Sequence, residues 1–136
     1  MLQQDEELKI VPFKAGMELK VKGVPKSGCD RFSINVGHSK EEVALHFDVR
    51  FNYADDQRVI VLNTRKNGHW QEEVRDTCFP FQWGQQFEVT ITFADDKFYI
   101  NLHNGYVVQF PNRLGDKQYD SFWFYGNVTI NALSIE

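Results

Sequence analysis

The chain has 136 residues, with 15 Lys and Arg against 19 Asp and Glu, a formal net charge of −4 and 42% hydrophobic residues. This length suits one folded domain over residues 1–136, and the apolar runs are far shorter than the ~20 residues that a membrane-spanning helix needs. The short apolar runs therefore argue against insertion into a membrane. Because Lys and Arg form no block, the composition argues against binding to nucleic acid or to an anionic membrane surface.

Strands are the elements predicted along the whole chain. Apolar residues alternate with polar or small ones, in chain order, in residues 19–22, 32–36, 43–51, 87–93, 98–102 and 128–130. This period of two is typical of β-strands with one buried face, and no long stretch shows a helical stripe. About ten strands separated by turn residues predict an all-β fold in which two antiparallel sheets pack as a β-sandwich.

Turn residues mark the hairpins between these strands. Asn104-Gly105 is the clearest case, because a two-residue type I′ turn favours this dipeptide, and Asn67-Gly68 is a second turn signal. The aromatic segment 79–83 is interpreted as core and turn rather than as a second aromatic binding site.

Residues 45–75 differ from ordinary half-buried strands. Side chains two residues apart share one face of a strand, so three neighbouring strands bring polar groups and one indole together. Seven side chains are predicted on this face: His46, Asp48, Arg50, Asn63, Trp70, Glu73 and Arg75. Hydroxyl-binding groups beside an aromatic ring suit a sugar. The alternative is a solvated face with ion pairs from Arg50 to Glu73 and from Asp48 to Arg75.

The same residues carry a family resemblance. The order and spacing of residues 46–50, 61–63 and 70–75 resemble the galectin signature H-x-N-x-R, V-x-N and W-x-x-E-x-R. Supporting matches are found at residues 50–52, 79–81, 91–93 and 110–113. Residues 32–37 and 50–57 are most similar to those of the fish galectins called congerins. The resemblance covers nearly the whole chain.

The resemblance implies a non-catalytic lectin with a sandwich of the jelly-roll, concanavalin-like type. It implies binding of β-galactosides such as lactose and N-acetyllactosamine, carried on glycoproteins or glycolipids, without a metal or other cofactor. On the matching positions, His46 and Arg50 would bind the axial 4-hydroxyl of galactose. Asn63 and Glu73 would bind its 6-hydroxyl, and Trp70 would stack on its apolar face.

Two departures from the family pattern concern this site. Asp48 stands where the signature has Asn, so it is expected to accept from a sugar hydroxyl, to leave donation to Arg50 and His46, or to pair with Arg50 or Arg75. The resemblance also implies that Arg75, with Glu73 and Arg50, would hold the glucose or N-acetylglucosamine next to galactose. Ala54 lies near where several galectins have a second His. A role for Asp48 and Glu73 as a glycosidase acid–base pair is disfavoured, because the neighbouring arginines favour ionised carboxylates.

Assembly and location are further expectations. One site per chain cannot crosslink glycans, so we expect an isologous homodimer through edge strands 8–11 and 128–135 that agglutinates glycan-bearing targets. The opening MLQQDEELK lacks a secretory pattern, and Cys29 and Cys78 show neither metal nor redox spacing. The family resemblance implies a cytoplasmic and extracellular location, reached by non-classical export. The alternative function is a galectin-like structural protein of the lens type with weak or lost sugar binding.

Overall fold

The computed structural model describes residues 8–9 and 11–136, and the regular elements in these residues are all strands. They are β1 (Leu8–Lys9), β2 (Phe13–Lys14), β3 (Glu18–Pro25), β4 (Arg31–Ser39), β5 (Glu42–Tyr53), β6 (Asp56–Lys66), β7 (His69–Trp70), β8 (Val74–Asp76), β9 (Phe87–Ala94), β10 (Lys97–Asn101), β11 (Val107–Pro111), β12 (Gln118–Tyr119), β13 (Ser121–Gly126) and β14 (Val128–Ile135). The all-β prediction is confirmed.

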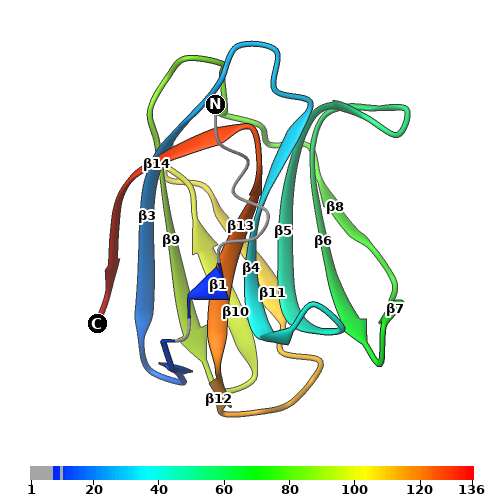
Figure 1. Ribbon diagram of the computed structural model, residues 1–136, viewed down its shortest axis with the longest axis vertical. Helices are drawn as coiled ribbons and strands as arrows, with labels where there is room; N and C mark the ends of the chain where they lie inside the picture. The colour runs from blue at the N-terminus through cyan, green and yellow to red at the C-terminus, as the bar shows by residue number, and fades with distance from the viewer. Residues whose placement is uncertain (1–7, 10) are drawn as a thin grey trace.

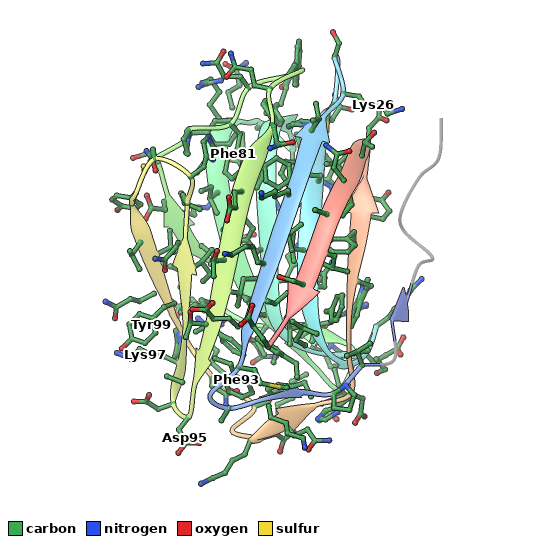
Figure 2. All side chains as sticks on the ribbon, turned by 90° about the vertical axis from the view of Figure 1, so that its left-hand side faces the viewer. Lys26, Phe81, Phe93, Asp95, Lys97 and Tyr99 are labelled. Carbon is green, nitrogen blue, oxygen red and sulfur yellow. The ribbon has the colours of Figure 1, made fainter. Side chains whose placement is uncertain are left out.

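Two antiparallel sheets pack face to face (Figure 1). One sheet has the order β1-β13-β4-β5-β6-β7, with β8 also paired to β6, and the other has the order β11-β10-β9-β3-β14. Figure 2 looks onto the second sheet, with strands of the first behind it. The predicted β-sandwich is therefore confirmed. A short pair, β12 with β2, lies outside both sheets.

The core lies between the two sheets and is rich in aromatic rings. Buried and partly exposed side chains alternate along all of β9, as the period of two predicts. Phe93 is fully buried and stacks on Phe98, with 4.8 Å between the ring centroids. In Figure 2, Phe81 and Phe93 lie toward opposite ends of this core, whereas Asp95 lies at the turn between β9 and β10. The packed core leaves the outer face of the larger sheet free for a site.

Strand register brings the predicted polar residues together. His46 pairs with Asn35 of β4 on one side and with Asn63 of β6 on the other. Val61 of β6 pairs with Arg75 of β8. His46 therefore lies between amide side chains of two neighbouring strands, whereas Asp48 and Arg50 have polar neighbours on β4 and valines on β6.

Two-residue turns connect the strands that carry these groups. Asn67 and Gly68 both have positive φ, at 52° and 79°, and they join β6 to β7 as a type I′ turn requires. Ala54 and Asp55 have the same combination, at 53° and 68°, between β5 and β6. Ala54 is thus a turn residue at the end of the β5–β6 hairpin.

The hairpin at Asn104-Gly105 is confirmed, but its predicted turn type is wrong. Strands β10 and β11 pair from Lys97 with Pro111 up to Asn101 with Val107, which leaves a longer connection than two residues. Only Gly105, with φ at 88°, has positive φ there. Its backbone N–H donates to the carbonyl of Leu102 over 2.9 Å. Because a type I′ turn needs positive φ at both central residues, the loop is of another type.

In residues 8–9 and 11–136, no helix is long and apolar enough to cross a membrane.

Both cysteines are free thiols, with Cys29 buried and Cys78 partly exposed. Burial raises the pKa of the Cys29 thiol to about 11.

Candidate functional site

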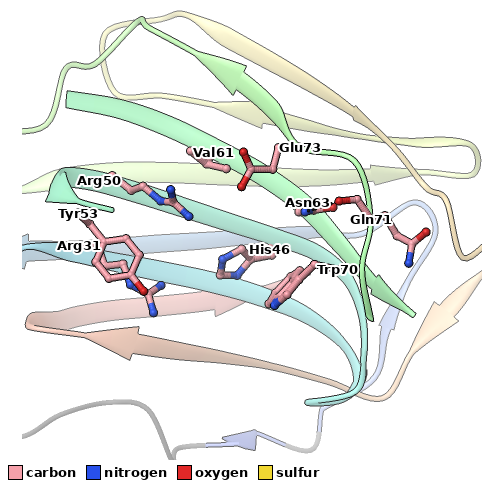
Figure 3. A pocket seen from close by; sticks show the side chains of 9 residues that line it. All are labelled: Arg31, His46, Arg50, Tyr53, Val61, Asn63, Trp70, Gln71 and Glu73. Atoms are coloured by element: carbon pink, nitrogen blue, oxygen red, sulfur yellow. Dashed lines mark hydrogen bonds between the residues drawn. The ribbon is translucent and has the colours of Figure 1, made fainter. Parts of the chain in front are cut away.

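A cavity of about 410 Å³ lies on the outer face of the larger sheet (Figure 3). Five of the seven predicted site residues line it: His46, Arg50, Asn63, Trp70 and Glu73. The other lining residues are Arg31, Tyr53, Val61 and Gln71. Polar side chains of β4, β5 and β6 line the cavity, together with Trp70 of β7.

Asp48 lies beneath this cavity and does not line it. Its side chain has no exposed surface, so the expected direct bond to a sugar hydroxyl does not fit its position. Its carboxylate accepts from Arg31 Nη1 over 3.0 Å and from Arg50 Nε over 2.9 Å. Burial alone would raise the pKa of Asp48, but the neighbouring His46, Arg31 and Arg50 lower this pKa to about 2. Asp48 is therefore ionised and holds two guanidiniums in place.

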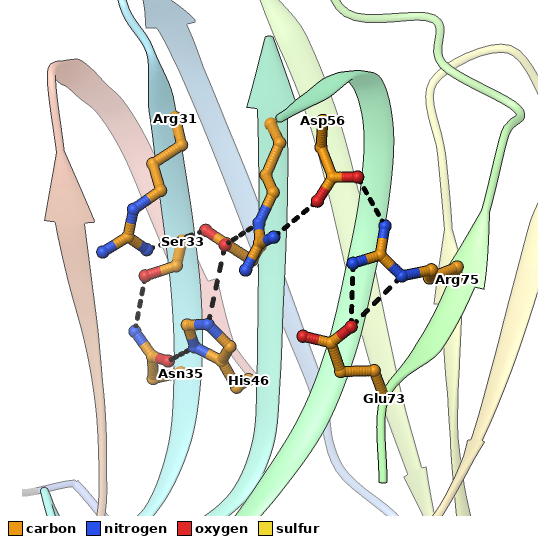
Figure 4. A network of polar contacts seen from close by, with 9 residues as sticks. Arg31, Ser33, Asn35, His46, Asp56, Glu73 and Arg75 are labelled. Carbon is orange, nitrogen blue, oxygen red and sulfur yellow. Dashed lines mark hydrogen bonds and ion pairs between the residues drawn. The ribbon is translucent and has the colours of Figure 1, made fainter. Parts of the chain in front are cut away.

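A series of charge pairs crosses the site from β5 to β8 (Figure 4). Beyond its bond to Asp48, Arg50 donates from Nη1 to Asp56 Oδ2 over 2.7 Å. Asp56 Oδ1 accepts from Arg75 Nη1 over 2.7 Å, and Arg75 Nη2 donates to Glu73 Oε1 over 2.8 Å. Arg50 thus does not pair with Glu73 as the ion-pair alternative predicted, because Asp56 lies between the two guanidiniums. The predicted pair of Asp48 with Arg75 does not form for the same reason.

Hydrogen bonds on the β4 side orient His46. Asn35 donates from Nδ2 to Ser33 Oγ over 3.0 Å and to the Trp123 carbonyl over 3.4 Å, which leaves Asn35 Oδ1 as an acceptor. That oxygen lies 2.6 Å from His46 Nδ1, so we assign the hydrogen of the neutral ring to Nδ1. The other ring nitrogen, Nε2, lies 3.8 Å from Asp48 Oδ2, where a charged ring donates as expected and a neutral ring accepts.

Asn63 is more enclosed than its predicted role requires. Its side chain is largely buried, and its Oδ1 accepts from the backbone N–H of Thr64 over 2.7 Å and from Arg113 Nη1 over 3.3 Å. Its Nδ2 donates to the Gln71 carbonyl over 3.0 Å. A carboxamide has two N–H groups, so one N–H remains for a ligand.

Trp70 presents an exposed aromatic face beside the polar groups. Its residue exposure is 49%, and its ring centroid lies 4.7 Å from that of His46. The guanidinium of Arg65 lies over the indole, 5.4 Å from the ring centroid. This placement fits a stacking surface better than a core residue.

Three contributors to the site were missed from the sequence. Arg31 belongs to β4, and its guanidinium lies over the rings of Tyr53 and Tyr125, at 4.5 Å and 4.8 Å from their centroids. Tyr53 itself lines the cavity, at the end where Ala54 begins the turn. The alternation of polar residues on β4 was a signal for Arg31. The bridging position of Asp56 had no such signal, because it depends on the fold of the β5–β6 turn.

This arrangement is suited to binding, and Asp48 does not fit the role of a general acid. Asp48 is buried and has a lowered pKa, whereas a glycosidase acid needs a raised pKa and access to the leaving group. Among the residues that the structure describes, no group of three or more His, Cys, Asp or Glu side chains could hold a metal ion.

A β-sandwich with a polar cavity and an exposed indole on one outer face defines a sugar-binding protein, a lectin. More particularly, the chain belongs to the galectin family, since the family model described as galactoside-binding lectin matches residues 7–135. Galectins bind sugars without catalysis, and the chain is a galactoside-binding lectin rather than an enzyme.

Relatives and solved structures agree with this assignment. The chain is 47% identical to galactose-binding lectin l-1 of Anguilla japonica, over 95% of this chain and 91% of that protein. It is 45% identical to congerin-2 of Conger myriaster over 96% of both chains, in line with the expected similarity to fish congerins. A lactose- and MES-liganded congerin II has a TM-score of 0.91 at 45% identity, over 94% of this chain and 96% of that one. A homodimeric agglutinin from chicken liver has a TM-score of 0.90 at 31% identity, over 95% and 98%.

Proposed function

We propose that this chain binds β-galactosides such as lactose and N-acetyllactosamine on glycoproteins or glycolipids, through the cavity on β4, β5 and β6. The observation that carries the proposal is the cavity itself, which gathers five signature residues from three separate segments of the chain. Lactose bound to the similar congerin II supports this ligand class.

Selectivity for galactose follows from donors and acceptors held in fixed directions. Arg50 is anchored by Asp48 and Asp56, and His46 is anchored by Asn35, so both meet a ligand hydroxyl without rearranging. Glucose differs from galactose at the 4-hydroxyl alone. A sugar with the equatorial hydroxyl would leave these two groups without a partner, at a cost of roughly 1 to 3 kcal/mol per group.

Isothermal titration calorimetry with lactose tests this function, with cellobiose as the epimeric control. Micromolar to millimolar binding of lactose and none of cellobiose is expected. Folded protein that binds neither sugar would reject the proposal and favour the structural role. The structural role was considered because Asp48 replaces the Asn of the family signature. The Asp48 carboxylate is buried and bonded to Arg50, so it keeps the Arg50 side chain oriented and favours the function of a lectin.

We further propose that the chain crosslinks glycans as a homodimer. β14 ends the five-stranded sheet, and its exposed Leu133 lies along this edge. A homodimeric relative of the same fold supports the idea. Residues 8–11 were also expected in the interface. Their strand β1 lies at the edge of the larger sheet, and residue 10 lies outside the described residues.

Light scattering at micromolar concentration tests the assembly. A dimeric mass is expected for the wild type, and Leu133→Lys should reduce it toward the monomer, because a two-fold axis would bring two added charges together. Val107→Lys adds the same charge to an exposed position on β11, at the opposite end of the sheet, and should remain dimeric. A monomeric wild type would reject the homodimer.

A further inference from the structure

A cavity of about 430 Å³ lies apart from the sugar site, beside the end of the β5–β6 hairpin. We name it the Trp83 cavity. Its volume is within the range of roughly 300 to 1,000 Å³ that is usual for small-molecule sites. Six described residues line it, none of which lines the sugar site: Phe51, Asn52, Gln57, Arg58, Gln82 and Trp83.

Trp83 supplies the aromatic surface of this cavity. Segment 79–83 was interpreted as core and turn; Phe81 is buried at one end of the core (Figure 2), whereas Trp83 lies in a turn and is 48% exposed. The indole Nε1 donates to the Cys29 carbonyl over 3.0 Å, which fixes the ring and uses its only donor. The indole therefore offers a ligand a fixed ring face rather than a hydrogen bond.

Arg58 supplies the charge. Its Nη2 donates to the Phe79 carbonyl over 3.2 Å, and its guanidinium lies over the Phe79 ring, 4.8 Å from the centroid. These contacts fix the side chain without a counter-charge, and in residues 8–9 and 11–136 Arg58 forms no ion pair. Arg58 is also the only charged residue among the six described residues of the lining. The cavity thus contains one uncompensated cation.

The cation and the indole are held on either side of Phe51. The Phe51 ring is nearly buried, and its centroid lies 5.8 Å from that of Trp83 and 5.1 Å from that of Phe79, which carries the Arg58 guanidinium. The backbone of Arg58 has φ at 52°, a region that few non-glycine residues adopt and that is enriched at functional sites. The fold therefore places a flat apolar surface and a positive charge in one cavity.

The lining favours an aromatic acid over a neutral sugar. The exposed lining has more apolar than polar surface, and in the sugar site this order is reversed. A flat ring stacks on an indole, and a carboxylate accepts from the guanidinium N–H groups that Arg58 does not use on Phe79. The exposed carboxamides of Asn52, Gln57 and Gln82 can donate to the same carboxylate. A neutral sugar would leave the cation without a counter-charge.

We propose that the Trp83 cavity binds a small aromatic carboxylate, whose ring stacks on Trp83 and whose carboxylate pairs with Arg58. This is a second ligand site, and it does not depend on galactoside binding, because the two cavities have different lining residues. One chain can therefore hold a galactoside and an aromatic acid at the same time.

An NMR titration with three ligands tests the proposal. Phenylacetate should bind in the millimolar range or more tightly, and it should shift the indole Nε1–H signal of Trp83 but not that of Trp70. Cyclohexylacetate keeps the charge without the aromatic ring, and 2-phenylethanol keeps the ring without the charge. Each should bind at least about threefold more weakly than phenylacetate, whose affinity should fall as salt is added.

Four variants locate the contacts. Trp83→Leu and Arg58→Gln should each weaken phenylacetate binding by about fivefold or more, and Arg58→Gln should also remove the salt dependence. Trp70→Leu removes an indole of almost equal exposure, at 49%, and should bind phenylacetate as wild type does. Arg113→Gln is the matched control for charge, because Arg113 also lies 4.8 Å from a phenylalanine centroid and lines neither cavity. The amide spectrum shows that each variant is folded.

The outcomes separate this proposal from the proposed function. Folded wild type that binds no phenylacetate would overturn the Trp83 cavity as a site. Equal affinities for the three ligands, or wild-type affinity in both Trp83→Leu and Arg58→Gln, would overturn it as well. Lactose is absent from these titrations, so failure to bind lactose would reject the proposed function alone.

Discussion

Arg50 and Asp48, two residues apart on β5, share one face of the strand, and Arg50 Nε donates to Asp48 Oδ2 over 2.9 Å. Only Arg50 lines the sugar site, because Asp48 is covered by the arginine that it orients. The family signature has Asn at position 48, and the carboxylate here adds a charge-assisted bond at the base of the site.

The Asp48 carboxylate should make stability depend on acid pH. Its pKa is lowered from 3.8 to about 2 in the fold, so its contribution is present above 3.8 and is lost as the pH falls toward about 2. This difference corresponds to about 2 kcal/mol. Urea unfolding should give a higher free energy of unfolding for the wild type than for Asp48→Asn at neutral pH, and this difference should disappear as the pH falls toward about 2. A difference in the free energy of unfolding that does not change with pH would contradict this role.

Asp56 should influence sugar binding without touching the ligand. It accepts from Arg50 and from Arg75, at 2.7 Å each, and it does not line the cavity. Asp56→Asn should weaken lactose binding by about fivefold, because both guanidiniums lose a charged partner. Calorimetry checks this, with Asp95→Asn at an exposed position as control. Unchanged affinity in Asp56→Asn would show that Asp48 alone orients Arg50.

The contribution of Trp70 to lactose binding can be distinguished from the general effect of removing an exposed indole. Trp70→Leu should weaken lactose binding by roughly 1 to 3 kcal/mol. Trp83→Leu is the matched control, because Trp83 is 48% exposed against 49% for Trp70 but lines a different cavity. Equal affinities of Trp70→Leu and wild type in calorimetry would remove the stacking role.

His38 should stabilise the fold most in acid. Its Nδ1 and Nε2 lie 2.8 Å from carboxylate oxygens of Asp120 and Asp116, and only the charged ring donates to both. Burial works to lower its pKa, but these two bonds raise it above 6.5. The contribution is therefore complete below 6.5 and is lost as the pH rises through the raised value.

Thermal unfolding across pH checks the role of His38. His38→Ala should be less stable than wild type below pH 6.5, and the difference should shrink in alkaline solution. His69→Ala, at an exposed position on β7, is the control. A difference that grows with pH would mean that the neutral ring is the form that the fold stabilises.

The sequence alone determined the fold class and the face that carries the site. The alternation with a period of two predicts which of residues 43–51 point toward the core. The spacing of His46, Asp48 and Arg50 predicts that they lie on the opposite face of the strand. Asn67-Gly68 likewise specified its turn, because few dipeptides adopt two positive φ angles. These properties are local, so they can be read from neighbouring residues.

Only the tertiary structure decided which polar groups meet. An alternation with a period of two predicts which face of a strand a side chain lies on, but not how deeply it is buried or which side chain it contacts. It therefore did not show that Asp48 lies beneath Arg50 or that Asp56 separates Arg50 from Arg75. The contribution of Arg31 depends on β4 lying next to β5. The Asn104-Gly105 turn differed for a related reason: the register of β10 with β11 set the loop length, and the dipeptide did not. Contacts across strands depend on register and strand order, which no single segment contains.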